Sequence, residues 1–192
     1  MQTEWEATFW PIEKDDIRAR LQDVGATLVR PERLMHRVNL YLPEGSTFKG
    51  FARVRNEGRK ITLSVKDMSG TRIDEQKEAE IIVNNFKDAE ELLRALGCRD
   101  KNYQETRREE WELDGVEICI DEWPFLEPFV EIEGDSEEQV RTSAKRLGFV
   151  WEEARFCSAD RLYAERYGVP HSFINQGIPR LTFEMESPFK NK

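Results

Sequence analysis

Long apolar runs are missing from this sequence of 192 residues, and so is any excess of positive charge. No run approaches the roughly 20 apolar residues of a membrane-spanning helix, so we expect no membrane segment. The first residues also lack the basic and apolar stretches of a secretory signal. With 29 basic and 38 acidic residues, the net charge of −9 argues against non-specific binding to nucleic acid, which depends on neutralising phosphates.

Cysteine is scarce, and several catalytic motifs are absent. Cys98, Cys119 and Cys157 are far apart and form no CxxC pair, which is typical of reduced thiols in a cytoplasmic protein. The sequence contains no GxxxxGK[ST] phosphate loop, no HExxH motif and no GxSxG elbow. The enzyme classes that depend on those motifs therefore have no support.

The charged residues that are present follow a pattern. In five strand-like segments they stand two positions apart, or four apart around Cys119: Glu4/Glu6, Arg53/Arg55, Glu78/Glu80, Glu117/Asp121 and Glu131/Glu133. Alternate residues of a strand point to the same face, so each segment presents one charged face and one mostly apolar face. Because the charges are of both signs, the pattern suits a polyanion that carries a bound metal.

Hydrophobic spacing predicts a chain of hairpins interrupted by helices. The predicted strands cover residues 3–9, 34–42, 50–56, 59–67, 73–83, 103–113, 115–121, 128–133 and 181–185. The predicted helices cover residues 13–24, 86–96, 136–147 and 158–167. This order indicates an α+β fold, an eight-stranded, largely antiparallel closed β-barrel or tunnel with helices packed outside. We expect one domain over residues 1–192, in which 169–192 extend the same fold.

The strand pattern alone leaves open which face of the barrel is inside. In an ordinary scaffold the charged faces lie in solvent. The amphipathic helices, however, need an apolar surface, and the apolar strand faces offer one. If the helices cover those faces, the charges line the interior, where they must be paired, hydrated or bound to a ligand.

Seven stretches extend this pattern in order over most of residues 1–165. Glu4-Trp5-Glu6-Ala7-Thr8 resembles a Glu-x-Glu-x-Lys strand, and Phe51 to Arg55 resembles Leu-Arg-x-Arg. Ile61 to Lys66 is similar to Leu-Thr-x-Lys, and Lys77 to Glu80 to an Arg-x-Glu strand. Arg108 to Trp111 resembles Lys-x-Arg-x-x-Tyr, Asp121 with Phe129 to Glu133 resembles Asp followed by Val-Glu-x-Glu, and Ser158 to Leu162 resembles Ser-Tyr-x-x-Leu. Together these motifs resemble the CYTH family, the triphosphate tunnel metalloenzymes.

The resemblance implies a metal-dependent enzyme that acts on a triphosphate-bearing small molecule. Class IV adenylyl cyclases, thiamine triphosphatases and inorganic tripolyphosphatases are its known kinds, and the implied cofactor is Mg²⁺ or Mn²⁺. By position, the implied phosphate-binding residues are Arg53, Arg55, Lys66, Arg108 and Arg155. The implied metal-binding residues are Glu4, Glu6, Asp121, Glu131 and Glu133, and the implied catalytic residues are Glu78, Glu80 and Arg55. We expect a monomer or homodimer with no nucleic-acid or membrane partner.

Three positions depart from the family pattern. Thr8 and Thr106 stand where the family has lysines, and Asn39 stands where it has aspartate. The loss of two cations weakens phosphate binding or nucleophile activation, so a non-catalytic nucleotide or polyphosphate binder is the alternative. Lys49 and Lys60 are neighbouring cations that we consider as compensation.

Overall fold

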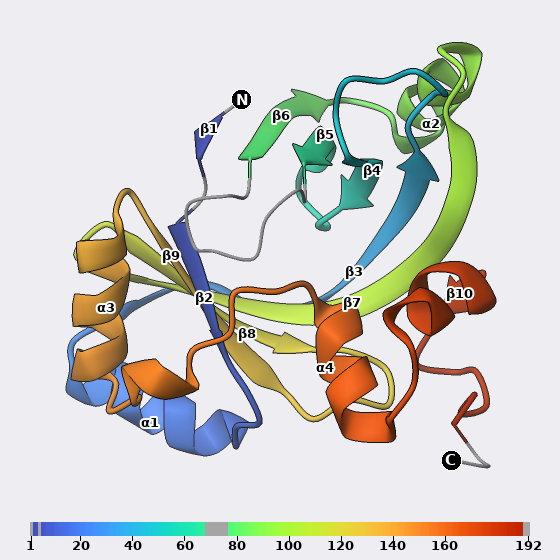
Figure 1. Cartoon of the computed structure of the whole chain (residues 1–192). Coiled ribbons are helices and arrows are strands. Elements are labelled where there is room, and N and C mark those ends of the chain that lie inside the picture. Colours follow the sequence, from blue (N-terminus) through green and yellow to red (C-terminus); the bar gives the residue numbers. More distant parts are fainter. Residues whose placement is uncertain (1, 4, 68–76, 190–192) are drawn as a thin grey trace.

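The computed structural model describes residues 2–3, 5–67 and 77–189, which form a curled sheet with helices around it (Figure 1). The strands are β1 (Gln2–Thr3), β2 (Trp5–Phe9), β3 (Thr27–Tyr41), β4 (Gly50–Asn56), β5 (Ile61–Asp67), β6 (Lys77–Val83), β7 (Arg99–Leu113), β8 (Val116–Glu122), β9 (Phe129–Gly134) and β10 (Arg180–Leu181). The helices are α1 (Lys14–Asp23), α2 (Phe86–Ala95), α3 (Glu137–Arg146) and α4 (Ala159–Tyr167), with short helical turns η1 (Trp151–Glu153) and η2 (Phe173–Gly177).

The strand order explains how the sheet curls. It runs β1-β6-β5-β4-β3-β7-β8-β9-β2 with antiparallel neighbours, and β10 pairs in parallel with β7. The two ends of this order, β1 and β2, are consecutive pieces of the N-terminal segment. β1 places Gln2 opposite Glu78, whereas β2 places Glu6 opposite Glu133. The α+β class is thus confirmed, but the expected full closure is not: the sheet is curled and open where the N-terminal segment changes partners.

β3 begins earlier than the sequence pattern predicts. It spans 15 residues from Thr27, whereas alternation is regular only from Leu34. Its first half contains Pro31, which has no backbone N–H for the ladder. The β3–β7 ladder accommodates the missing donor through register shifts between Leu28 and Arg30 and between Arg30 and Arg33.

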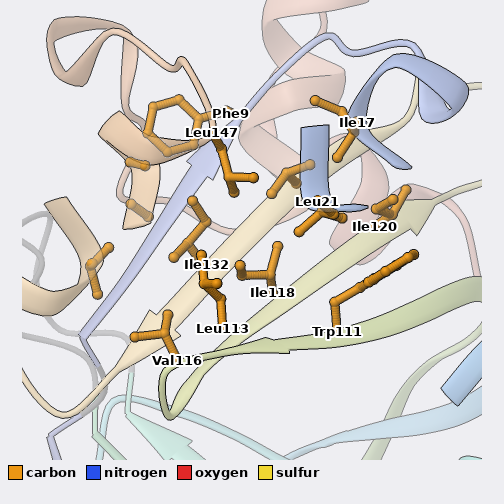
Figure 2. Packing of buried hydrophobic residues seen from close by; sticks show 14 residues of the cluster. Phe9, Ile17, Leu21, Trp111, Leu113, Val116, Ile118, Ile120, Ile132 and Leu147 are labelled. Atoms are coloured by element: carbon orange, nitrogen blue, oxygen red, sulfur yellow. The ribbon is translucent and has the colours of Figure 1, made fainter. Parts of the chain in front are cut away.

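The largest apolar cluster lies between the sheet and two helices (Figure 2). Ile17 and Leu21 of α1 pack with Leu147, which caps α3, and with Ile118 and Ile132 of the strands. Each of these five side chains is at most 2% exposed. Burial of one such side chain contributes about 1.5–3 kcal/mol. The apolar faces of β2, β8 and β9 are therefore covered by helices, as expected.

The helix ends follow local hydrogen-bonding rules. The Asn85 side chain accepts hydrogen bonds from the backbone N–H groups of Lys87 and Asp88 and so caps α2. Ser136 caps α3 in the same way, with the backbone N–H of Gln139 as donor. α2 then packs Ala89 and Leu93 against the outer side of the β3–β4 region.

The C-terminal segment packs beside α4. Leu162 and Tyr163 of α4 share an apolar cluster with Ile174, Leu181 and Phe189. The predicted strand 181–185 is wrong beyond Leu181. The backbone N–H of Thr182 points to Met185 Sδ (3.5 Å), and that of Phe183 donates to Glu105 Oε2 (3.3 Å), so neither continues a ladder. Within the described ranges, no helix combines the length and apolar character needed to cross a bilayer.

Candidate functional site

The curled sheet surrounds a cavity of about 1320 Å³. Strands β2 to β9 and the segment that leads into α4 contribute its lining. Nine of the implied phosphate-binding, metal-binding and catalytic residues line it: Glu6, Arg53, Arg55, Lys66, Glu78, Glu80, Arg108, Glu131 and Glu133. The reading in which these charged strand faces lie on an outer surface is therefore wrong.

One wall of the cavity is basic. Arg53 and Arg55 stand two apart on β4, Lys66 follows on β5, and Arg37 comes from β3. Arg37 is directly opposite Arg55 in the β3–β4 ladder. Like charges that face each other across a ladder destabilise it unless an anion or counter-ion lies between them. This wall therefore favours a bound anion.

Carboxylates already accompany most of these cations. Arg53 Nη2 lies 2.8 Å from Glu78 Oε1, and Arg55 Nη2 lies 2.6 Å from Glu57 Oε1. Burial opposes ionisation of Glu57, but Arg55 and Lys60 hold its pKa below the usual value. The Arg55 Nε atom is buried and has no hydrogen-bond partner among the described residues. The wall thus keeps donor capacity for an incoming oxygen.

The opposite wall is acidic. Glu133 on β9 is directly opposite both Glu6 on β2 and Glu117 on β8. Burial, and then the charges of Glu6 and Glu117, raise the pKa of Glu133 to about 7. Burial and the nearby Glu6 and Asp121 raise the pKa of Glu131 well above its usual range. Carboxylates that repel each other in this way favour a cation.

Arg108 joins the two walls. Its Nε and Nη2 atoms donate to Asp121 at 2.8 and 2.5 Å, and Nη2 also contacts Glu131. The Asp121 side chain is only 1% exposed, so this fork is its main compensation. Asp121 does not line the cavity, and the geometry makes it a support for Arg108.

Of the remaining expected site residues, one is not described and one lies elsewhere. Glu4 falls outside the described residues. Arg155 does not line the cavity: its Nη2 atom pairs with Glu165 at 2.8 Å and its Nη1 atom donates to Trp10 O at 3.0 Å. Its backbone forms a two-way bridge with Thr8, at 2.9 Å in each direction. The backbone of Arg155 therefore pairs with the edge of β2 that does not face β9, and its side chain is engaged by Glu165 and Trp10.

The threonines at the family lysine positions are buried. Thr8 is 1% exposed, and its Oγ1 atom has no hydrogen-bond partner among the described residues. Thr106 is fully buried, and its Oγ1 atom accepts a hydrogen bond from Arg37 Nη2 at 2.7 Å. Of the two cations weighed as compensation, Lys60 lines the cavity, whereas Lys49 is exposed and does not.

Arg37 and Glu57 are the residues that sequence reasoning missed. The alternation of the strand places Arg37 on the same face as Asn39, a family position, so the pattern contained a signal for Arg37. Glu57 follows β4 directly, and its sequence position gave no sign that it pairs with Arg55.

The oxygen donors of the acidic wall suit a hard divalent cation such as Mg²⁺ or Mn²⁺. Burial first, and then repulsion between the carboxylates, raise the pKa values of Glu131 and Glu133, and a bound cation would oppose both effects. The wall does not present a finished coordination shell: across residues 2–3, 5–67 and 77–189, no three His, Cys, Asp or Glu side chains are already arranged around one metal position. The donor chemistry fits a metal that also takes ligands from substrate or water.

Comparisons with known proteins agree with this architecture. None of the curated proteins matches the sequence. Among solved structures, a conserved hypothetical protein from Pyrococcus furiosus is 23% identical, with a TM-score of 0.69, over 83% of this chain and 99% of its own. A candidate adenylate cyclase from Vibrio parahaemolyticus is 12% identical, with a TM-score of 0.71, over 85% of this chain and 98% of its own.

A third structure is that of a candidate adenylyl cyclase from Hippeastrum, described as having a dominant triphosphatase activity. It is 14% identical, with a TM-score of 0.56, over 88% of this chain and 98% of its own. At such identities the likenesses show the fold. The model of the CYTH domain matches residues 11–163, most of the sequence, so the chain belongs to the CYTH domain family.

Proposed function

We propose that this protein binds a triphosphate-bearing small molecule in the cavity and processes it with the help of a divalent metal ion. The observation that carries the proposal is the pairing of a basic wall with an acidic wall around one cavity of about 1320 Å³. Membership of the CYTH domain family and likeness to a cyclase candidate and to a protein with triphosphatase activity support it.

The basic wall would hold the phosphates. Arg53 and Arg55 present guanidinium forks that match phosphate oxygens, and Lys66 and Arg108 add charge from neighbouring strands. Glu78 lies 2.8 Å from Arg53, and Glu80 lies 3.7 Å from Arg55. An arriving phosphate would compete with these carboxylates for the same donors.

Glu80 is the more exposed of the two carboxylates and leaves more room for an attacking oxygen beside it. Its side chain is 31% exposed, and its Oε atoms lie 3.7 Å from Arg55 and 4.0 Å from Lys60. We assign Glu80 the task of taking a proton from the attacking oxygen, and Glu78 the task of orienting Arg53. Both assignments follow from position beside the phosphate-binding arginines.

The acidic wall would hold Mg²⁺ or Mn²⁺ through Glu6, Glu131 and Glu133, with Asp121 supporting through Arg108, and Glu4 stays a further candidate ligand. When bound, such an ion supplies positive charge to phosphate oxygens and lowers the cost of charge build-up during phosphoryl or nucleotidyl transfer. The carboxylates' own role is to fix the ion opposite the arginines.

A substrate panel tests the proposal and separates its two chemistries. ATP, thiamine triphosphate and tripolyphosphate are each incubated with the protein and Mg²⁺ or Mn²⁺, and phosphate, pyrophosphate and cyclic nucleotide are measured together. Phosphate release identifies a hydrolase, whereas pyrophosphate with cyclic AMP identifies a cyclase. The absence of metal-dependent turnover with all three substrates would contradict an enzymatic function.

A non-catalytic binder is the second candidate, because Thr8 brings a neutral, buried hydroxyl where the family has a cation. The same panel decides between the two. Micromolar binding of tripolyphosphate by calorimetry, with no product in any assay, would select the binder.

A further inference from the structure

Arg37 differs from the other arginines that line the cavity from its strands, Arg53, Arg55 and Arg108, in its lack of an acidic partner among the described residues. It is 6% exposed and lines the cavity from β3. Arg53, Arg55 and Arg108 each pair with a carboxylate at 2.8, 2.6 and 2.5 Å, respectively. Within the described part of the chain, Arg37 forms no ion pair.

Its surroundings are cationic and leave a donor unused. Burial lowers the pKa of Arg37, and the nearby charges of Arg53, Arg55 and Arg108 lower it further, while Asp121 opposes them. The buried Arg37 Nε has no hydrogen-bond partner among the described residues. A buried guanidinium in such a place destabilises the protein unless an anion approaches it.

Two neighbours nevertheless hold the side chain in place. Nη2 donates to Thr106 Oγ1 at 2.7 Å, and the guanidinium carbon lies 4.8 Å from the centre of the Trp123 ring. Both contacts are to neutral groups, so they orient the guanidinium and leave its charge available. Nε stays available for an oxygen ligand.

We propose that Arg37 is a phosphate-binding residue of the cavity, held in place by Thr106 and Trp123, and that it supplies from β3 a cation for the bound triphosphate. This inference rests on the proposed function. It adds a third arginine to the β3–β4 side of the cavity, opposite Arg55 in the ladder. The phosphate chain would then lie between β3 and β4 and not along β4 alone.

Calorimetry with inorganic tripolyphosphate and Mg²⁺ tests this assignment in the intact chain. Arg37→Gln should weaken binding about 10- to 100-fold, the range expected when a hydrogen bond to a charged group is lost. Arg37→Lys keeps the charge without the fork and should lose less. The control is Arg107→Gln, which removes the same charge from a 43% exposed side chain on the outer face and should change binding less than about twofold.

The outcomes separate this inference from the proposed function. If the wild type binds tripolyphosphate and Arg37→Gln binds it equally well, the assignment of Arg37 alone is overturned. If the wild type binds neither tripolyphosphate nor ATP, the proposed function fails as well.

Urea unfolding of the ligand-free protein distinguishes phosphate binding from a structural role. Removal of a buried, uncompensated cation should leave the midpoint of Arg37→Gln at or above that of the wild type. A clearly lower midpoint would make Arg37 a structural residue and overturn the inference.

A double variant tests the role of the charge itself. Thr106→Lys in the Arg37→Gln background places a cation within reach of the same position and should recover part of the lost affinity for tripolyphosphate. No recovery would count against a charge-based role.

Discussion

At the scale of single residues, the cavity depends on how buried charges are compensated. Arg108 shows this most clearly, because one guanidinium contacts both Asp121 and Glu131. Asp121 is fully buried and does not face the cavity, so its charge is useful only through Arg108. The pair therefore fixes one cation of the site at a defined position between the two walls.

Loss of Arg108 should destabilise the protein itself. Arg108→Gln leaves the buried Asp121 carboxylate without its partner, and the free energy of unfolding should fall by about 3–5 kcal/mol. Urea denaturation measures this, with Arg107→Gln as the control for loss of a surface charge on the same strand. Equal midpoints for the two variants would show that the Arg108–Asp121 pair is not a structural element.

Replacement of Thr8 by lysine is expected to raise activity, whereas replacement of Arg108 is expected to lower stability. Thr8→Lys adds a cation to the same face of β2 as Glu6, near Glu131, which is its direct cross-strand neighbour. If the missing charge limits activity, turnover of the best substrate should rise, by about 10-fold or more for a restored contact to a charged group. Thr142→Lys, on the exposed side of α3, is the matched control and should leave turnover unchanged. A Thr8→Lys protein no faster than this control would contradict the role given to the position.

At the scale of elements, helices α1 and α3 determine which way the strands face. Their apolar sides cover β2, β8 and β9, so the charged residues of these strands turn toward the cavity (Figures 1 and 2). The period of two in a strand means that a one-residue slip would exchange the two faces. A slip in strand register would therefore disrupt both the docking of α1 and α3 and the charged face that lines the cavity.

Helix docking can be tested at Leu21, which is fully buried in α1. Leu21→Ala should lower the free energy of unfolding by about 2–5 kcal/mol, because it removes buried methyl groups and leaves a cavity. Leu92→Ala in α2 is the matched control: that side chain is 55% exposed, and its loss should change stability by less than about 0.5 kcal/mol. Equal effects of the two changes would refute the packing of α1 on the sheet.

Most helices and strands could be predicted from the sequence because the residues that signal each end lie within a few positions of it. Ser136 is followed by Gln139 at capping distance, and glycines such as Gly97 and Gly148 adopt the positive φ that ends a helix. The early start of β3 could not be predicted in this way. Its first half contains Pro31 and is held by a 15-residue partner, β7, so only the tertiary pairing makes it a strand.

The functional site shows the same contrast between what local spacing predicts and what depends on tertiary pairing. Pairs within one strand, such as Arg53 and Arg55, are visible in the sequence because their spacing is fixed. The position of Arg37 opposite Arg55 depends on the β3–β4 register, and its contact with Thr106 depends on how β3 lies against β7. Neither can be read from the alternation of one strand.

At the scale of the whole molecule, a protein with a net charge of −9 gathers Arg37, Arg53, Arg55 and Lys66 on one wall of its cavity. Low-dielectric walls strengthen the field of such a group of charges inside the cavity. The basic wall of the cavity therefore attracts an anionic ligand that the net charge of the protein repels. The cavity thus brings charges of both signs together in one place in the fold.

A crystal structure of the protein with tripolyphosphate and Mn²⁺ would show whether the cavity binds both ligands, because anomalous scattering locates the metal independently of the phosphates. We expect the phosphate chain against Arg37, Arg53 and Arg55, and a manganese peak beside Glu131 and Glu133. Phosphate and manganese bound only on the outer surface, with the cavity empty at saturating ligand, would contradict this expectation.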